Sequence, residues 1–318
     1  MTELMELYNM VISGHVVTRE EAASLIDMPI DELTEAADNI RKHFCGNKFD
    51  LCTIINGKSG KCPENCKFCA QSAFYDTNIR EFPLVDEDTI VNAAVYNAKK
   101  GVKRFSIVTS GRRLSKDEIN QICNDIKKIK ESCNISVCGS FGLLDDDDFN
   151  ALKKAGVERI HNNLETSAGY FDNVCTTHKY SDKINAILAA RDAGLDICSG
   201  GIMGLGESFM DRIDMVIELR NLGIKSIPVN MLNPIKGTPL FENQKLTNDE
   251  MCRTVAIFRF LIPDGFIRLA GGRGLLPDKG KRCFMSGANA AITGDMLTTS
   301  GISVDTDLEL LKKLGYEI

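Results

Sequence analysis

Three cysteines, Cys62, Cys66 and Cys69, stand close together, with three and then two residues between them. Three thiolates in one short loop can bind three irons of a [4Fe–4S] cluster and leave the fourth iron without a protein ligand. An odd number of cysteines fits a disulfide framework poorly. A zinc knuckle would normally bring a fourth Cys or His nearby, whereas the next histidine along the chain is His161. The spacing therefore favours an iron–sulfur cluster with one open iron.

This CxxxCxxC spacing resembles that of the radical S-adenosylmethionine superfamily, and the aromatic Phe68 before the last cysteine fits the resemblance. In that superfamily the matching residue lies near the adenine. The resemblance implies that S-adenosylmethionine chelates the open iron through its amino and carboxylate groups. One electron from the cluster then cleaves the sulfonium, and the 5′-deoxyadenosyl radical takes hydrogen from an unactivated carbon. The cofactors supply this chemistry, whereas the protein binds and orients them and excludes water.

Length and composition limit the other possibilities. The chain has 318 residues, of which 43% are hydrophobic, and this suits one large domain with a substantial core. A net charge of −6 argues against nucleic acid as a main partner, and no apolar run approaches the roughly 20 residues of a membrane span. The acidic N-terminus lacks the features of a signal peptide. Twelve cysteines without such a peptide predict a reducing, cytoplasmic location.

Strand-like and helix-like segments alternate from residue 49 onward. Strands are predicted at 49–56, 103–109, 134–141, 158–164, 195–202, 225–231, 264–270 and 290–293. Helices are predicted at 86–100, 115–132, 146–155, 180–193, 208–222, 247–261 and 277–288. Eight such strands predict a (β/α)₈ TIM-type barrel, with a doubly wound open sheet as the alternative. We expect one domain over 1–318: helices over 1–44, the barrel over 45–299 and a closing helix over 300–318.

A glycine-rich run, GGIMGLGE, occupies residues 200–207 at the end of the fifth predicted strand. Barrel enzymes place their chemistry at the carboxyl ends of the strands, so we expect this run and the cysteine loop at the same mouth. Glycines there let the backbone approach a ligand closely. The run matches a GxIxGxxE pattern that radical enzymes place beside adenine and ribose. It makes Gly201, Ile202 and Met203 predicted cofactor contacts, together with Thr109 at the end of the second strand.

Cysteines and arginines fall inside the predicted strands. Cys52, Cys138 and Cys198 lie in strands one, three and five, and Arg104 and Arg268 lie in strands two and seven. A single strand cysteine is usually an inert small hydrophobe. A guanidinium buried without a partner is costly, however, so two arginines inside the barrel indicate an anion there. The thiolates and sulfides of a second iron–sulfur cluster would be such an anion.

Sequence blocks from about residue 50 to the C-terminus resemble the biotin synthase family in order and spacing. They lie at 56–66 (NGKSGKCPENC), 163–167 (NLETS), 198–201 (CSGG), 230–232 (NML), 236–240 (KGTPL), 267–269 (IRL) and 283–289 (CFMSGAN). The resemblance implies insertion of sulfur between the C6 methylene and C9 methyl carbons of dethiobiotin, with two molecules of S-adenosylmethionine consumed. The first radical attacks C9, a bridging sulfide of an auxiliary cluster captures the carbon radical, and a second radical at C6 closes the ring. The resemblance further implies a homodimer and an external electron donor such as flavodoxin or ferredoxin.

The resemblance also assigns roles around S-adenosylmethionine. It implies that Asn162 lies near the cofactor and that Asn163 and Glu165 contact its ribose or the substrate. Lys183 is implied to meet the cofactor's carboxylate, where the family often has Arg. A lysine supplies the charge but not the bidentate fork. A solvated helix position for Lys183 remains equally open.

For the substrate, the resemblance implies that Asn230 hydrogen-bonds the ureido ring of dethiobiotin, with Met231 and Leu232 beside it. Asn163 is the second residue expected to reach the substrate. A purely structural role in a strand-end turn remains open for both asparagines.

One departure from the family's better-known pattern concerns the auxiliary cluster. That pattern holds a [2Fe–2S] cluster with three Cys and one Arg, and the matching positions here are Ser106, Cys138, Cys198 and Arg268. Ser106 replaces a cysteine, whereas Cys52 stands on the first strand where the pattern has Ser. We therefore predict that Cys52, Cys138 and Cys198 bind the auxiliary cluster. Three thiolates would also suit a four-iron cluster with an extra sulfide, with Arg268 as a ligand or a neighbouring charge.

Other functions remain as alternatives. Related radical enzymes of the hydrogenase-maturation or methylornithine-synthase type share the cysteine loop and the barrel but need no interior strand cysteines. A non-catalytic iron–sulfur carrier would need no cofactor pocket, so the glycine-rich run argues against it. The remaining cysteines are interpreted as packing or surface thiols, with Cys45 and Cys175 as candidate spare ligands: Cys45, Cys123, Cys133, Cys175, Cys252 and Cys283.

Overall fold

The nine strands of the computed structural model, which describes residues 2–298 and 301–318, form one parallel sheet. In sheet order they run β5-β4-β3-β2-β1-β9-β8-β7-β6, and β5 also pairs with β7, which closes the sheet. β5 and β6 are two parts of one barrel position, so the described residues form the eight-stranded (β/α)₈ barrel that the sequence predicts. The strands are β1 (Asp50–Lys58), β2 (Arg104–Thr109), β3 (Ser136–Ser140), β4 (Arg159–His161), β5 (Asp196–Cys198), β6 (Gly201–Met203), β7 (Ser226–Met231), β8 (Phe266–Leu269) and β9 (Ala290–Thr293).

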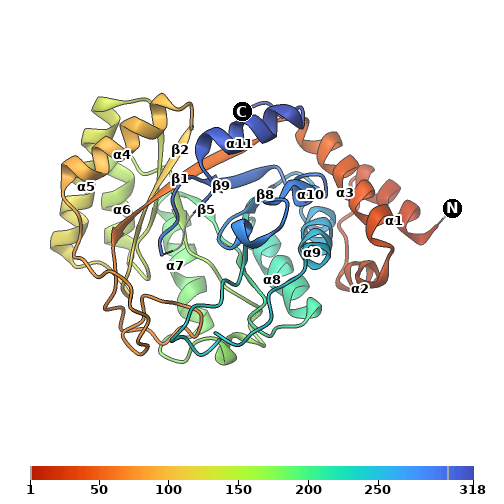
Figure 1. The fold of residues 1–318 in the computed structure, drawn as a ribbon, viewed down its shortest axis with the longest axis horizontal. Helices are drawn as coiled ribbons and strands as arrows, with labels where there is room; N and C mark the ends of the chain where they lie inside the picture. Colours follow the sequence, from red (N-terminus) through yellow and green to blue (C-terminus); the bar gives the residue numbers. More distant parts are fainter. Residues whose placement is uncertain (1, 299–300) are drawn as a thin grey trace.

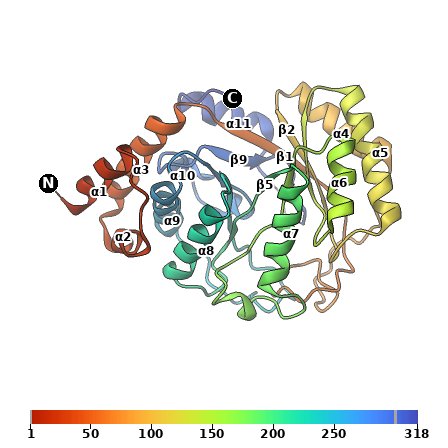
Figure 2. The ribbon, with the colours of Figure 1, turned by 180° about the vertical axis from the view of Figure 1, so that it is seen from behind.

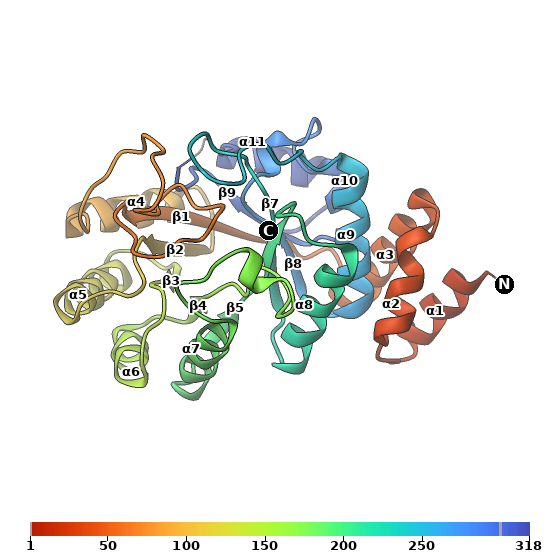
Figure 3. The same cartoon turned by 90° about the horizontal axis from the view of Figure 1, so that it is seen from below.

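In the described chain, long helices surround the strands (Figure 3). Several begin with a capping box, in which a Ser or Thr side chain and an acidic side chain three residues later satisfy the first backbone amides. Ser115, Ser208 and Thr247 are such caps. The surrounding helices are α4 (Glu87–Lys99), α5 (Lys116–Ser132), α6 (Asp146–Ala155), α7 (Tyr180–Asp192), α8 (Phe209–Asn221) and α9 (Asn248–Leu261).

The N-terminal helices pack on the outside of the barrel beside α9 (Figures 1 and 2). They are α1 (Glu3–Ile12), α2 (Arg19–Ser24) and α3 (Ile30–Cys45), as expected for residues 1–44. The closing helix is α11 (Val304–Lys313), and Glu317 beyond it pairs with Lys48 just before β1. The predicted boundary at 299–300 lies outside the described residues. No helix in the described parts of the chain has both the length and the apolar character to cross a membrane.

Three predicted elements differ from the structure. The helix expected at 277–288 is wrong, because α10 covers only Lys281–Phe284. Gly280 and Gly287 flank it with φ of +85° and +106°, and this left-handed backbone cannot continue an α-helix. The strand expected at 158–164 ends at His161, and the strand expected at 195–202 is interrupted at Ser199 and Gly200.

The alternation of side chains along β2 shows how the barrel obtains a polar interior. Phe105 and Ile107 point outward and are fully buried in the apolar cluster shared with the surrounding helices. Arg104, Ser106 and Val108 point inward and line a cavity. Because successive strand residues face opposite sides, one strand serves both the apolar core and a site.

Candidate active site

The barrel encloses a cavity of about 330 Å³ that extends from its mouth to its interior. Many of the predicted site residues line it: Cys52, Phe68, Cys138, Asn163, Glu165, Cys198, Ile202, Asn230, Met231, Leu232 and Arg268. His161 is also among the lining residues. The other predicted site residues in the described chain are outside this lining: Cys62, Cys66, Cys69, Thr109, Asn162, Lys183, Gly201 and Met203.

The cysteine loop follows β1 and has almost no regular secondary structure. The amide of Cys62 donates to the carbonyl of Gln71 at 3.0 Å, and the amide of Cys69 donates to the carbonyl of Cys66 at 3.0 Å. All three thiols are half-buried. Burial raises the pKa of the Cys69 thiol to about 11 and so disfavours the thiolate. The charge of a bound metal would offset this effect and favour the thiolate. Donor type, number and spacing fit a [4Fe–4S] cluster.

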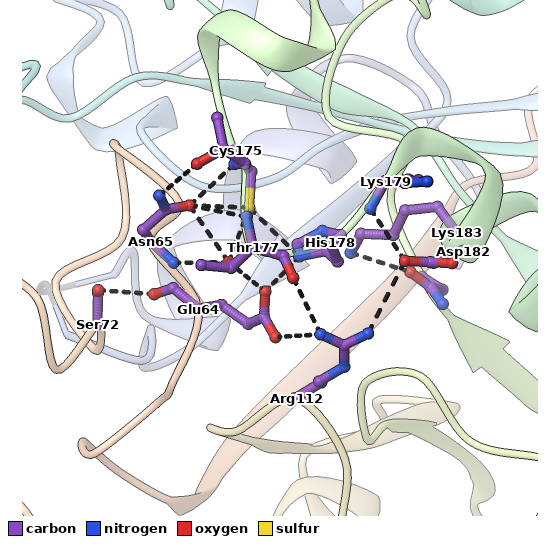
Figure 4. A network of polar contacts seen from close by, with 12 residues as sticks. Glu64, Asn65, Ser72, Arg112, Cys175, Thr177, His178, Lys179, Asp182 and Lys183 are labelled. Atoms are coloured by element: carbon purple, nitrogen blue, oxygen red, sulfur yellow. Dashed lines mark hydrogen bonds and ion pairs between the residues drawn. The ribbon is translucent and has the colours of Figure 1, made fainter.

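Asn65 attaches this loop to the segment 174–178, which precedes α7 (Figure 4). Its Oδ1 accepts from the amide of Thr176 at 2.9 Å, and its Nδ2 donates to the hydroxyl of that residue at 2.7 Å. Its backbone amide donates to Thr177 Oγ1 at 3.0 Å. These contacts substitute for the secondary structure that the loop lacks.

Glu64 reinforces the same attachment from a buried position. Its Oε2 lies 2.6 Å from Nδ1 of His178 and accepts a hydrogen bond from the Thr177 hydroxyl. Its Oε1 lies 3.3 Å from Nη1 of Arg112, which also donates to the Thr177 carbonyl at 3.0 Å (Figure 4). The carboxylate is 7% exposed, so its charge is compensated by these partners rather than by water. Nothing in the CxxxCxxC spacing predicts these roles of Glu64, His178 and Arg112.

Cys175 lies directly beside the cysteine loop. The ligand atoms of Cys66, Cys175 and His178 all lie within 4.8 Å of one another. Hydrogen bonds from Cys66 and His178 lower the pKa of Cys175 to about 3. The spare-ligand hypothesis for Cys175 therefore has geometric support, although the trio shares Cys66 with the predicted cluster.

The other cysteines lie away from the cavity. Cys45 is the last residue of α3, Cys123 is buried on α5, and Cys133 follows the end of α5. The sulfurs of Cys252 and Cys283 are 3.7 Å apart and fully buried between α9 and α10. These positions agree with the packing roles expected for them, and Cys45 has no place at the site.

The interruption between β5 and β6 shapes the mouth of the barrel. A Cβ on Gly200 would lie 2.0 Å from the carbonyl oxygen of Pro228, and one on Gly201 would lie 2.4 Å from that of Glu165. Only glycine permits these approaches. Asn163 accepts a hydrogen bond from the Gly200 amide at 3.0 Å and so replaces the missing ladder contact. This contact gives Asn163 a structural role at the strand end, and the residue also lines the cavity.

Glu165, at the mouth, has a backbone φ of +71°. A non-glycine residue in this region costs free energy and often marks a functional site. Its side chain lines the cavity, and burial raises the pKa of the carboxyl. Behind it, Lys183 on α7 donates to Asn162 Oδ1 at 3.2 Å (Figure 4). Lys183 therefore faces the mouth rather than solvent alone.

Asn230, the predicted substrate contact, already bridges two backbone segments. Its Nδ2 donates to the carbonyl of Gly201 at 3.0 Å, and its Oδ1 accepts from the amide of Gly271 at 2.9 Å. An amide has a second N–H and a second lone pair, and both remain for a ligand in the cavity. Met231 and Leu232 add apolar wall beside it.

The interior cysteines line the deeper part of the cavity from alternate strands. In register, Cys52 on β1 lies beside Arg104, and Cys138 on β3 lies beside Arg159. Cys198 on β5 lies beside His161. Burial and the neighbouring Cys138 raise the pKa of Cys52. For Cys198, the hydrogen bond and charge of His161 outweigh burial and lower the pKa to about 6.

Three guanidinium groups surround these thiols. Arg268 lies with its Nη2 3.2 Å from Asp50 Oδ1, and Arg104 has its Nε 3.6 Å from Oδ2 of the same carboxylate. The third is Arg159 on β4. Buried nitrogen atoms on all three make no hydrogen bond within the described chain: Arg104 Nε, Arg159 Nε and Nη1, and Arg268 Nη2. An anion in the cavity would satisfy them, so thiols and guanidiniums together fit an auxiliary iron–sulfur cluster.

The chain is similar to known proteins over almost its whole length. Residues 56–220 match the model of the Radical SAM superfamily, and residues 228–317 match the Biotin and Thiamin Synthesis associated domain. The chain is 56% identical over 315 residues to a biotin synthase of Brachyspira hyodysenteriae, covering 99% of this chain and 95% of that protein. It is 52% identical over 318 residues to a biotin synthase of Clostridium botulinum, covering all of both chains. The chain belongs to the biotin synthase family.

Among solved structures, methylornithine synthase superposes with a TM-score of 0.85 at 18% identity, covering 98% of this chain and 96% of that one. HydG, a maturase of the [FeFe]-hydrogenase, superposes with a TM-score of 0.84 at 18% identity, covering 99% and 74%. At this identity the likeness concerns the barrel fold alone. The alternative classes named from the sequence thus share the fold, whereas sequence identity separates the biotin synthase family from them.

For this biotin synthase family member, the sequence-based site missed Arg159. The signal was present, because Arg159 and His161 are two residues apart in a predicted strand and therefore share a face. Pairing Arg104 with Arg268 already implied an interior anion, and a third inward arginine strengthens that inference. Thr109, a predicted cofactor contact, lies at the end of β2 and outside the cavity lining. Its hydroxyl is 3.5 Å from the carbonyl of Ser140.

Proposed function

We propose that this member of the biotin synthase family converts dethiobiotin to biotin inside the barrel cavity, with one iron–sulfur centre at the mouth and a second in the interior. The observation that carries the proposal is the shared cavity. Cys52, Cys138 and Cys198 line the same space as Glu165 and Asn230. Sulfur insertion needs a substrate carbon held between a radical source and a sulfur donor, and this layout allows it.

Cys62, Cys66 and Cys69 would hold the [4Fe–4S] cluster. When bound together, this cluster and S-adenosylmethionine supply an adenosyl radical that takes hydrogen from the substrate. The residues at the mouth orient the cofactor: Phe68 presents an aromatic wall, and Asn163 and Glu165 offer polar groups beside it. Lys183 brings a positive charge next to Asn162, which suits a carboxylate.

Cys52, Cys138 and Cys198 would hold the auxiliary cluster, which supplies the sulfur atom of the new ring. Arg268 donates from Nη1 to the carbonyls of Asp50 and Ala291 and lies against the Asp50 carboxylate. Burial alone would raise the pKa of the Asp50 carboxyl. The charges of Arg268 and Arg104 outweigh the effect of burial and lower the pKa, so Asp50 is ionised. A cation held in this way compensates charge rather than binding iron. This favours the four-iron alternative, because a [2Fe–2S] cluster would need Arg268 as its fourth ligand.

Dethiobiotin would lie between the two centres. Asn230 has hydrogen-bonding capacity left for the ureido ring, and Met231, Leu232 and Ile202 provide apolar walls along the cavity. A substrate held there is close to both reaction partners, and water is displaced from the carbon that reacts. The homodimer, the flavodoxin or ferredoxin donor and the cytoplasmic location stay predictions.

An anaerobic incubation with S-adenosylmethionine, dithionite and dethiobiotin tests this function. We expect biotin, methionine and 5′-deoxyadenosine. Formation of 5′-deoxyadenosine without any biotin would indicate a different radical enzyme. Formation of neither product, by protein whose iron and sulfide are complete, would indicate a carrier.

A further inference from the structure

Arg159 is the least satisfied cation in the cavity. It lies on β4, and its side chain is 11% exposed. Its Nη2 is 3.6 Å from Oδ2 of Asp196, a distance that allows an ion pair but no good hydrogen bond. Its Nε and Nη1 are buried and make no hydrogen bond within the described chain. Three N–H groups of one guanidinium, one on Nε and two on Nη1, thus have no acceptor among the described residues.

The two other cavity arginines have more of their donors engaged. Arg268 donates to two backbone carbonyls and lies against Asp50. Arg104 donates from Nη1 to Ser136 Oγ at 2.8 Å and lies 3.6 Å from Cys138 Sγ. Asp50 is close to both of them. The charge of Arg159 also acts on Asp50, but among the described residues its ion pair within 4 Å is with Asp196 at the surface.

The surface ion pair alone does not explain this arrangement. The side chain of Asp196 is 73% exposed, and pairs with such a partner contribute roughly 0–1 kcal/mol. A buried donor without an acceptor costs about 1–3 kcal/mol. A packing role could be filled by an apolar side chain of similar length without that cost. The position of Arg159 is favourable only if the cavity supplies an acceptor.

We infer that Arg159 is a positioning residue for the auxiliary centre, and that its Nε and Nη1 groups donate hydrogen bonds to anionic sulfur held beside Cys138. The inference rests on the proposed function. Register supports it, because Cys138 pairs with Arg159 between β3 and β4. An arginine remains protonated in proteins and can only donate, so it suits sulfide or thiolate. Donors to cluster sulfur stabilise the more negative, reduced state and raise the reduction potential.

The test compares Arg159→Met with Asp196→Asn, both loaded anaerobically with iron and sulfide. Methionine keeps an unbranched side chain, shorter than that of arginine, and removes all of the N–H groups. We expect the auxiliary iron and sulfide to be lost to a chelator about ten-fold faster or more, with the loop cluster unchanged. Asp196→Asn removes the surface partner and keeps the inward N–H groups, so its iron content should equal that of the unmodified chain.

Arg159→Lys keeps the charge and gives a second, milder variant. We expect it to fold, to bind the auxiliary cluster and to show a lower midpoint potential, because one flexible ammonium replaces two fixed donors. Unchanged chelator resistance in Arg159→Met would overturn the inference, and so would an unchanged potential in Arg159→Lys if the methionine variant fails to fold. An unmodified chain that binds iron and sulfide for one cluster only would instead overturn the proposed function.

Discussion

The cysteine loop and the barrel interior both offer three thiols, but they do so by different means. The loop takes its thiols from eight consecutive residues, 62–69, and leaves them half-buried at the mouth. The interior takes one thiol from each of β1, β3 and β5 and buries all three. The first site is defined by local spacing and the second by strand register. We therefore expect the two centres to respond separately to mutation.

Cys66→Ala should have the largest effect and would separate the two regions most clearly. Removing one of three thiolate ligands should abolish the loop cluster and, with it, formation of both 5′-deoxyadenosine and biotin. Iron and sulfide of the interior centre should remain. Cys133→Ala, at the end of α5, is the matched control and should keep full activity. Loss of all iron from Cys66→Ala would show that the two centres are not independent.

Glu64→Gln should weaken the loop without touching a thiol. The glutamine keeps the size of Glu64 but not the charge that compensates His178 and Arg112. Substitution of groups that orient metal ligands typically costs 10–100-fold in metal affinity. We expect about a ten-fold faster loss of loop-cluster iron to a chelator, followed by its visible absorbance. Lys61→Gln, whose side chain is 84% exposed, should behave like the unmodified chain. Equal rates in both variants would contradict the role given to Glu64.

Asn230→Ala tests the space between the two regions. Loss of hydrogen bonds worth about 1–1.5 kcal/mol should raise KM for dethiobiotin roughly ten-fold, with kcat less affected. Iron content of both centres should not change. Asn243→Ala is a matched control, because Asn243 also bridges to a glycine carbonyl, that of Gly204 at 3.1 Å, from outside the cavity lining. An equal rise in KM for both variants would reduce Asn230 to a structural residue.

The smallest effect concerns Asp125 on α5, which is remote from both centres. Burial, with Glu87 and Asp86 nearby, raises its pKa from 3.8 to about 6. An acid with a raised folded-state pKa binds more protons in the native state, so its contribution to stability falls as pH rises from about 4 to 6. Between pH 4 and pH 7, the free energy of unfolding of Asp125→Asn should therefore rise by about 1 kcal/mol relative to that of the unmodified chain. Urea unfolding at both pH values measures this difference. Any change in iron content would mean that stability and cluster binding are coupled.

The difference between the two regions also explains what the sequence could reveal. The loop cysteines are contiguous, so their spacing alone indicates a cluster. Cys52, Cys138 and Cys198 could be brought together only by assuming that the predicted strands close into a barrel. The apolar pattern shows 195–202 as one continuous strand. The structure interrupts it at Gly200, whose amide donates to the Asn163 side chain and whose missing Cβ allows a close approach to the Pro228 carbonyl.

The features that the sequence missed depend on long-range contacts. The attachment of Glu64 to His178 joins residues more than a hundred positions apart, and no local pattern records it. The short α10 is bounded by glycines whose left-handed backbone depends on tertiary contacts, so composition suggested a longer helix. The inward orientation of Arg159 could be predicted from the alternation of side chains along its strand, but only on the assumption that the barrel interior is polar.

The most direct test is anaerobic iron and sulfide analysis, with Mössbauer spectroscopy, of the unmodified chain and of Cys52→Ala. We predict two spectroscopically distinct clusters in the unmodified chain. In Cys52→Ala we predict that the interior iron is absent and that the loop [4Fe–4S] cluster is intact. Identical iron, sulfide and spectra in the two proteins would contradict the account, because Cys52 would then hold no metal.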